Sequence, residues 1–173
     1  EILTCDWSSD VCSSDLRDII DKYSCNGERI VVFGLANEQI TGEAVTKAII
    51  PMAFIILENE IRETAKETFE YFKKQGVAIK VISGDNPLTA SKVAIRAGID
   101  DATHYIDATT LKTDKDIADA VQKYTVFGRV IPEQKKKIIE AFKMAGNVVA
   151  MTGDGVNDVL ALKCADCSVA MAS

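Results

Sequence analysis

The chain has 173 residues, with 26 Asp and Glu against 20 Lys and Arg, and its formal net charge of -6 argues against a nucleic-acid partner. Its length suffices for one domain of typical size, or for one domain and part of another. No apolar run reaches the roughly 18 residues of a membrane span, and the five cysteines are irregularly spaced, so we expect a soluble piece in a reducing compartment.

Residues 1–16 differ from the rest of the chain. This stretch, EILTCDWSSDVCSSDL, holds the single Trp and shows neither helical nor strand periodicity. It lacks the basic start and the apolar middle of a signal peptide. The string resembles translated sequencing-adapter read-through, so we expect a non-native leader that is disordered or packs opportunistically.

From residue 17 onward the chain has regular patterns. We expect a short helix at 18–23, a strand at 29–36 and a polar connector at 37–47. Short apolar runs then alternate with amphipathic helices. The expected strands are 52–57, 77–82, 103–106, 125–127, 148–151 and 167–171, and the expected helices between them are 61–75, 86–98, 114–124, 132–146 and 158–165. This alternation of strongly apolar strands and helices predicts a parallel sheet covered on both faces.

Three of the loops that follow these strands carry polar groups. In a parallel sheet such loops converge on one edge. The first, 83–87, offers a hydroxyl, a glycine amide and a helix N-terminus to one anion. The second, 128–135, places Lys135 in a first helical turn, where its charge opposes the helix dipole.

The third loop, 152–158, follows the apolar strand 148–151 and combines two glycines with Asp154 and Asp158. Glycine allows a sharp turn and close approach to a ligand, and carboxylates are hard ligands of the kind that Mg²⁺ prefers. We interpret the three loops as a metal-phosphate site. Each loop taken alone is also compatible with an ordinary turn or an exposed lysine.

The segments ISGDNPLTAS, VFGRVIPEQK and MTGDGVNDVLAL, in that order, resemble the phosphorylation domain of P-type cation-transporting ATPases, which belongs to the haloacid-dehalogenase-like superfamily. The resemblance covers roughly 50–173. It implies an α/β fold, a Rossmann-like three-layer α/β/α parallel sheet of the haloacid-dehalogenase-like type that is incomplete because its central first strand is missing. Residues 17–49 resemble, more weakly, the C-terminal remnant of the nucleotide-binding domain and the hinge.

The resemblance implies Mg²⁺ and ATP as cofactors and assigns roles to residues of the last two loops. Asp154 would coordinate Mg²⁺ directly, and Asp158 would support the metal site and orient its neighbours. Asn157 would hydrogen-bond the phosphoryl group. Lys135 would neutralise charge on that group as it is transferred.

Further roles follow for the first loop and for its neighbours. The Ser83 hydroxyl and the Gly84 amide would hold phosphoryl oxygens, and Asp85 and Arg129 would face the bound nucleotide. Arg62 falls where the family has an acidic-proline-arginine hinge motif, but the prolines are absent here. A nucleotide role is therefore not assigned to that segment.

One departure from the family concerns the phosphorylated aspartate. The family carries it in an Asp-Lys-Thr-Gly-Thr motif, which this sequence does not contain. We therefore expect a fragment that is inactive alone and whose partners are ATP and the rest of one pump chain, with its nucleotide-binding, actuator and transmembrane domains. The parent protein would move a cation across the cell membrane, with this portion on the cytoplasmic side.

Two other functions stay open. The chain could derive from a soluble phosphatase of the same superfamily, or be a Mg²⁺- or nucleotide-binding module without catalysis. Cys164 and Cys167 have a metal-like spacing, but with a single distant His104 they cannot complete a zinc site. We interpret them as structural, with Cys167 at the start of a buried strand.

Overall fold

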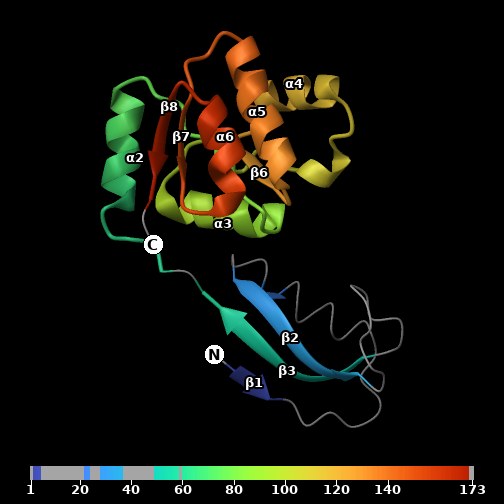
Figure 1. Cartoon of the computed structure of the whole chain (residues 1–173). Helices are drawn as coiled ribbons and strands as arrows, with labels where there is room; N and C mark the ends of the chain where they lie inside the picture. The colour runs from blue at the N-terminus through green and yellow to red at the C-terminus, as the bar shows by residue number, and fades with distance from the viewer. Residues whose placement is uncertain (1, 5–21, 24–27, 37–48, 59, 172–173) are drawn as a thin grey trace. The chain divides into compact units, whose positions relative to one another are not determined.

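The structure is a computed structural model that describes residues 2–4, 22–23, 28–36, 49–58 and 60–171 (Figure 1). The chain divides into two compact units, Glu1–Glu60 and Ile61–Ser173. Among the described helices, none combines the length and the apolar character that crossing a membrane requires.

The first unit is an antiparallel sheet with the strand order β1-β3-β2. Its strands are β1 (Ile2–Thr4), β2 (Arg29–Ala36) and β3 (Ile49–Leu57). The prediction that the strand at 52–57 opens the parallel sheet is wrong, because this strand pairs antiparallel with β2. Apart from β1 and the helical residues 22–23, the predicted leader at 1–16 and helix at 18–23 lie outside the described residues.

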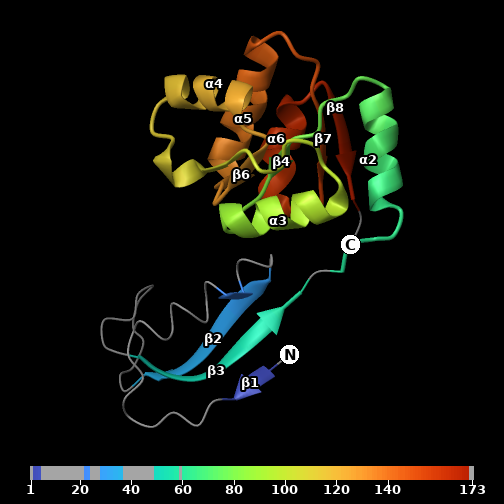
Figure 2. The same cartoon turned by 180° about the vertical axis from the view of Figure 1, so that it is seen from behind.

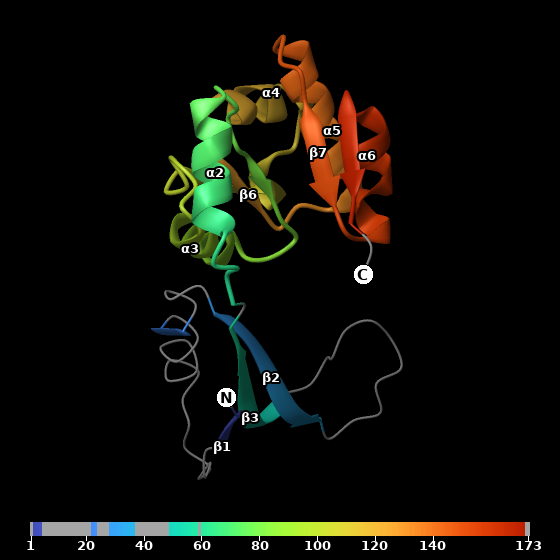
Figure 3. The same ribbon diagram turned by 90° about the vertical axis from the view of Figure 1, so that its left-hand side faces the viewer.

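The second unit holds two parallel sheets, with the strand orders β4-β6-β5 and β7-β8. These strands are β4 (Val81–Ile82), β5 (Tyr105–Asp107), β6 (Val126–Gly128), β7 (Ala150–Gly153) and β8 (Cys167–Ala170). The helices are α2 (Ala65–Lys74), α3 (Pro87–Ala97), α4 (Asp114–Lys123), α5 (Pro132–Met144) and α6 (Val159–Cys164), with 3-10 turns at Ala108–Thr110 and Val156–Asp158. Figure 3 shows α2 and α3 on one side of the strands and α5 and α6 on the other.

Local chemistry explains where the helices begin and end. Asn86 caps α3, because its side chain accepts a hydrogen bond from the Leu88 N–H, and Pro87 opens the first turn. Gly98 ends α3 in the left-handed region, at φ 88°. Thr113 begins α4 with a reciprocal capping box. The predicted starts and ends of these helices are confirmed within one residue.

The main core lies between α5, α4 and the central strand β6. Phe127 and Ile138 are fully buried there, and the Phe127 ring packs edge-on against Phe142 with a centroid separation of 6.3 Å. Ile82, which belongs to β4, and Val149, which precedes β7, both pack against this cluster. Both parallel sheets therefore share one hydrophobic core that α5 helps to form.

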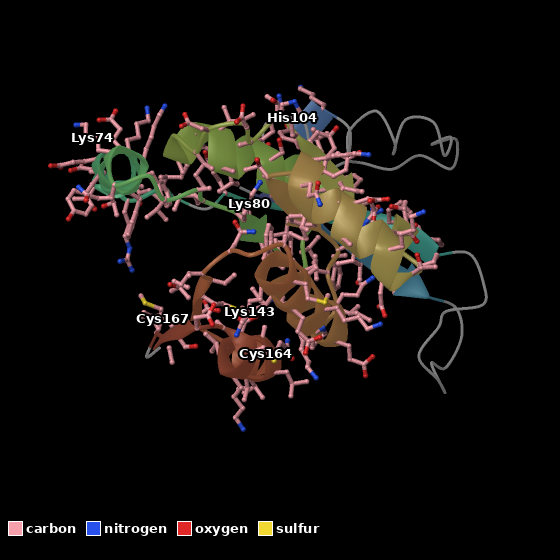
Figure 4. All side chains as sticks on the ribbon, turned by 90° about the horizontal axis from the view of Figure 1, so that it is seen from above. Lys74, Lys80, His104, Lys143, Cys164 and Cys167 are labelled. Atoms are coloured by element: carbon pink, nitrogen blue, oxygen red, sulfur yellow. The ribbon has the colours of Figure 1, made fainter. Side chains whose placement is uncertain are left out.

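Helix α5 is also tied at both ends to the part of the unit that contains β7 and β8. Near its start, Lys135 forms an ion pair with Asp158, with 2.6 Å between Nζ and Oδ1. Near its end, Lys143 pairs with Asp166 at 2.9 Å and donates to the Cys164 carbonyl at 2.9 Å. Figure 4 shows Lys143 directed toward Cys164.

The prediction of one sheet covered on both faces is only partly correct. Every residue of β6 is buried, but all four residues of β8 are exposed. Cys167 is therefore exposed and does not start a buried strand, which corrects the sequence prediction. The strand predicted at 77–82 is also shorter, because only Val81 and Ile82 pair.

Candidate functional site

Backbone hydrogen bonds join the first two predicted loops at the carboxyl end of β4 and β6. The Ser83 N–H donates to the Phe127 carbonyl at 2.9 Å, and the Ser83 carbonyl accepts from Val130 at 3.0 Å. The Arg129 N–H donates to the Asp85 carbonyl at 2.7 Å. The loops that contain Ser83, Asp85 and Arg129 are therefore held together by main-chain contacts that do not depend on side-chain identity.

Gly128 allows the end of β6 to touch the start of α3. A Cβ atom on this residue would lie 2.3 Å from the Cα of Pro87, a distance that no side chain tolerates. Glycine at this position therefore lets the N-terminus of α3 sit directly beside β6. Gly84 is exposed and has room around it, since its nearest neighbour would be the Val130 carbonyl at 3.8 Å.

The second and third loops are joined by the ion pair between Lys135 and Asp158. Both side chains are mostly buried, with exposed fractions of 13% and 10%. Gly153, at the end of β7, packs directly on the Asp158 side chain, since a Cβ atom there would lie 2.7 Å from the Asp158 Cβ. The pair therefore fixes the loop after β7 against the first turn of α5, in surroundings where a charge without a partner is costly.

α5 begins just after β6, so the contact between Lys135 and Asp158 also shows how the ends of β6 and β7 lie relative to each other. Lys135 lies near the carboxyl end of β6, and Asp158 follows the carboxyl end of β7. The carboxyl ends of both parallel sheets therefore meet at one edge, as the sequence predicted. Ser83, Arg129, Lys135 and Asp158 are brought to this edge through the segment 128–135.

Asp154 and Asn157 belong to the same loop, and both are exposed. Within the residues that the structure describes, no three His, Cys, Asp or Glu side chains form a metal cluster. Mg²⁺ usually takes one or two protein carboxylates and completes its octahedron with water and phosphate oxygens. Asp154 and Asp158 fit that donor set. Since Asp158 already contacts Lys135, the solvent-facing Asp154 is the better placed direct ligand.

Arg62 and His104, which were also considered from the sequence, take part in none of these contacts. Arg62 is exposed in the segment before α2. His104 is exposed and lies far from Cys164 and Cys167 in Figure 4.

A family profile described as haloacid dehalogenase-like hydrolase matches residues 17–166. The chain belongs to the haloacid dehalogenase-like hydrolase family.

Among its relatives are P-type cation-transporting ATPases, which this family member matches over most of its length. It is 45% identical over 148 residues to the probable cation-transporting ATPase exp7 of Streptococcus pneumoniae, and 42% identical over 154 residues to the calcium-transporting ATPase CtpE of Mycobacterium bovis. It is 30% identical over 162 residues to the magnesium-transporting ATPase, P-type 1, of Salmonella typhimurium. These matches cover 84%, 88% and 88% of the chain, but only 19%, 19% and 18% of the relatives.

One residue at this edge of the parallel sheets, Asp107, was not predicted from the sequence. Asp107 ends β5, and its Oδ2 accepts a hydrogen bond from Arg129 Nη1 at 2.7 Å. Hydrogen bonds from the Thr109 hydroxyl and N–H, together with Arg129, hold the pKa of Asp107 below its usual value. The signal was available, because Asp107 directly follows the predicted strand 103–106, as Ser83 follows 77–82.

The backbone of Arg129 is also unusual. Its φ of 51° lies in the left-handed region, which non-glycine residues rarely adopt. The hydrogen bond to the Asp85 carbonyl and the packing of Gly128 on Pro87 account for this conformation, since they fix the backbone on its N-terminal side. The guanidinium is half exposed and held by Asp107, so it can present its remaining N–H groups to an anion.

Proposed function

We propose that the chain is part of a P-type cation pump and supplies most of its phosphorylation domain. In this proposal residues 17–49 are the end of a nucleotide-binding domain and 50–173 belong to the phosphorylation domain, although the compact units divide at 60/61. The parent protein couples ATP hydrolysis, through an aspartyl-phosphate, to cation transport across a membrane, with this portion on its cytoplasmic side. The observation that carries the proposal is the mostly buried Lys135–Asp158 pair where three polar loops meet.

The chemistry of that edge suits phosphoryl transfer, in which positioning and charge neutralisation supply most of the catalysis. Lys135 is held near the phosphoryl position by Asp158 and neutralises negative charge there. Asp154, supported by Asp158, holds Mg²⁺, which when bound adds positive charge at the phosphoryl oxygens. Ser83, Gly84 and Asn157 contribute hydrogen bonds to those oxygens.

Nucleotide contacts are assigned to the neighbouring loop. Arg129, fixed by Asp107, meets the phosphates or the ribose of ATP, and Asp85 lies beside it. Arginine suits this role because its planar guanidinium can keep one carboxylate partner and still donate to an anion.

A binding measurement tests the site. Isothermal titration of the chain with Mg²⁺ and a non-hydrolysable ATP analogue is expected to show Mg²⁺-dependent heat. Asp154→Asn should abolish the Mg²⁺-dependent part, because it removes the exposed carboxylate ligand. Asp119→Asn, on the exposed face of α4, is the matched control and should bind as the native chain does. Equal Mg²⁺-dependent binding by Asp154→Asn would refute the assignment.

A turnover assay tests the inferred lack of activity. The sequence contains no Asp-Lys-Thr-Gly-Thr motif, so we expect no ATP hydrolysis and no acyl-phosphate from the chain alone. Mg²⁺-dependent hydrolysis by the pure chain that disappears in Asp154→Ala would show that this inference is wrong.

A soluble phosphatase of the same superfamily is the alternative origin. Arg129 with its partner Asp107 favours the pump, because a simple phosphate monoester carries one phosphoryl group, which Lys135 would serve, whereas a nucleotide carries further anionic groups suited to a second cation. Hydrolysis of p-nitrophenyl phosphate by the chain, without hydrolysis of ATP, would favour the phosphatase.

A further inference from the structure

A dense set of hydrogen bonds surrounds the turn at residues 107–110, which follows β5. One oxygen of Asp107, Oδ1, accepts from the Thr109 N–H at 3.0 Å and from the Thr109 hydroxyl at 2.6 Å. The other oxygen, Oδ2, accepts from Arg129 Nη1 at 2.7 Å. The Thr110 hydroxyl donates to the Asp107 carbonyl at 2.7 Å. The 107–110 turn therefore fixes the carboxylate that Arg129 contacts.

This arrangement requires a carboxylate, because both oxygens of Asp107 accept hydrogen bonds at the same time. An asparagine has a single acceptor oxygen, so it would lose either Thr109 or Arg129 as a partner. The pair with Arg129 is partly exposed, with exposed fractions of 52% and 25%, and pairs of this kind contribute little to stability. Its main effect is therefore on the direction in which the guanidinium points.

The same turn is fastened to the first turn of α5. Gln134 Nε2 donates to the Ala108 carbonyl at 2.9 Å, and Gln134 Oε1 accepts from the Ile131 N–H at 3.3 Å. In Figure 2 the turn, drawn in yellow, lies beside the lower end of α5. Gln134 directly precedes Lys135 in the chain. One set of hydrogen bonds therefore connects Arg129 with the helix that carries Lys135.

We propose that Asp107, Thr109 and Gln134 are positioning residues, which together hold the guanidinium of Arg129 at a fixed place relative to the ammonium of Lys135. Two cations held in this way suit a ligand with several anionic groups, such as a nucleoside polyphosphate. An arginine that is ordered beforehand loses less side-chain freedom when the ligand binds. The choice of ligand rests on the proposed function, whereas the ordering of Arg129 rests on the contacts alone.

A carboxylate beside Arg129 could also act against binding, because its negative charge repels phosphate. Thr109→Val separates this effect from positioning. The substitution removes the hydroxyl that anchors Asp107 but leaves the charge of the carboxylate in place. Positioning predicts weaker nucleotide binding by Thr109→Val, whereas repulsion alone predicts binding equal to that of the native chain.

Isothermal titration with Mg²⁺ and the non-hydrolysable ATP analogue measures this difference. Thr109→Val should raise Kd about three- to tenfold, because Arg129 must then be ordered by the ligand. Thr109→Ser keeps the hydroxyl and should bind as the native chain does. Thr103→Val, at an exposed position in the turn before β5, is the matched control and should leave Kd unchanged. Unchanged binding by Thr109→Val would overturn the proposal.

Double variants show whether these residues act through Arg129. Arg129→Gln should weaken binding, and adding Thr109→Val should weaken it no further, because the guanidinium that Thr109 helps to position is gone. Gln134→Leu should likewise weaken binding in the native background but not together with Arg129→Gln. Gln122→Leu, on the exposed side of α4, is its matched control. Losses that simply add would contradict positioning through Arg129.

A measurement of side-chain order tests the positioning without any ligand. The heteronuclear NOE of the Arg129 Nε–H group should indicate a rigid side chain in the native chain and in Thr109→Ser, and a mobile one in Thr109→Val. A mobile Arg129 in the native chain would show that the proposal is wrong. If this pattern of order is found but the native chain does not bind the ATP analogue, the proposed function is refuted and the positioning of Arg129 stands.

Discussion

Strands β6 and β8 are both short, parallel and partly apolar, yet their surroundings are opposite. β6 lies between β4 and β5 and has every residue buried, whereas β8 pairs with β7 alone among the described strands and has every residue exposed. The burial of a strand therefore depends on its neighbours more than on its own sequence. The two strands are also stabilised differently. Apolar side chains pack around β6, whereas hydrogen bonds and ion pairs hold the segment around β8.

The largest loss of stability is expected from a substitution in the buried strand β6. Phe127→Ala should lower the free energy of unfolding by about 3 to 5 kcal/mol, because it leaves a cavity against Phe142 and Ile138. Val169→Ala on β8 should cost less than about 0.5 kcal/mol, because that side chain is half exposed. Urea denaturation measures both. Similar losses in the two variants would show that the strands do not differ as described.

A smaller loss of stability is expected from the ion pair between Lys135 and Asp158, which joins the two parallel sheets. Lys135→Met leaves the Asp158 carboxylate mostly buried without its partner, which should cost about 3 kcal/mol. Lys137→Met, which removes an exposed ion pair with Asp114, should leave the unfolding transition nearly unchanged. The measurement is again urea denaturation. A loss in Lys137→Met as large as that in Lys135→Met would contradict the importance of burial.

The smallest effect is expected at the start of β8 and depends on pH. The Val149 N–H, and then Lys143, hold the pKa of Asp166 below its usual value. Because the folded pKa is the lower one, this carboxylate stabilises the fold above its unfolded pKa, near 3.9, and the benefit is lost as pH falls through the folded value.

Thermal melts across that pH range should reveal the contribution. Asp166→Asn should lower Tm slightly at neutral pH, and the difference from the native chain should disappear in acid. Asp119→Asn, on exposed α4, is the control and should follow the native curve at every pH. A constant difference between Asp166→Asn and the native chain would show that ionisation of Asp166 is not the cause.

The ends of the helices could be predicted from the sequence, whereas the pairing of strands that are distant along the chain could not. Asn86, Pro87 and Gly98 mark the ends of α3 because capping involves residues that are close along the chain. The partner of the strand at 52–57 is formed by residues 20 to 28 positions earlier, and its apolar run suits either kind of sheet. The exposure of Cys167 was missed for a similar reason, since it depends on what else covers β8.

The candidate edge was predictable to the extent that strand ends converge. Ser83, Arg129 and Lys135 were found because each follows an apolar run that is recognisable in the sequence. Asp107 follows such a run as well, but its role depends on the direction of the Arg129 side chain, which no pattern encodes. The partnership of Lys135 with Asp158 also needed coordinates, since these residues are 23 positions apart.

The two tethers of α5 have a mechanical consequence. Lys135 and Lys143 are separated by about 12 Å along the helix at 1.5 Å per residue, and both hold the segment that carries β7, α6 and β8. Because a helix is stiff along its axis, a displacement of Asp158 would move α5 and, through Lys143, also Asp166 and the Cys164 carbonyl. A change at the candidate edge would therefore tilt the whole segment and move its far end, at Asp166 and Cys164.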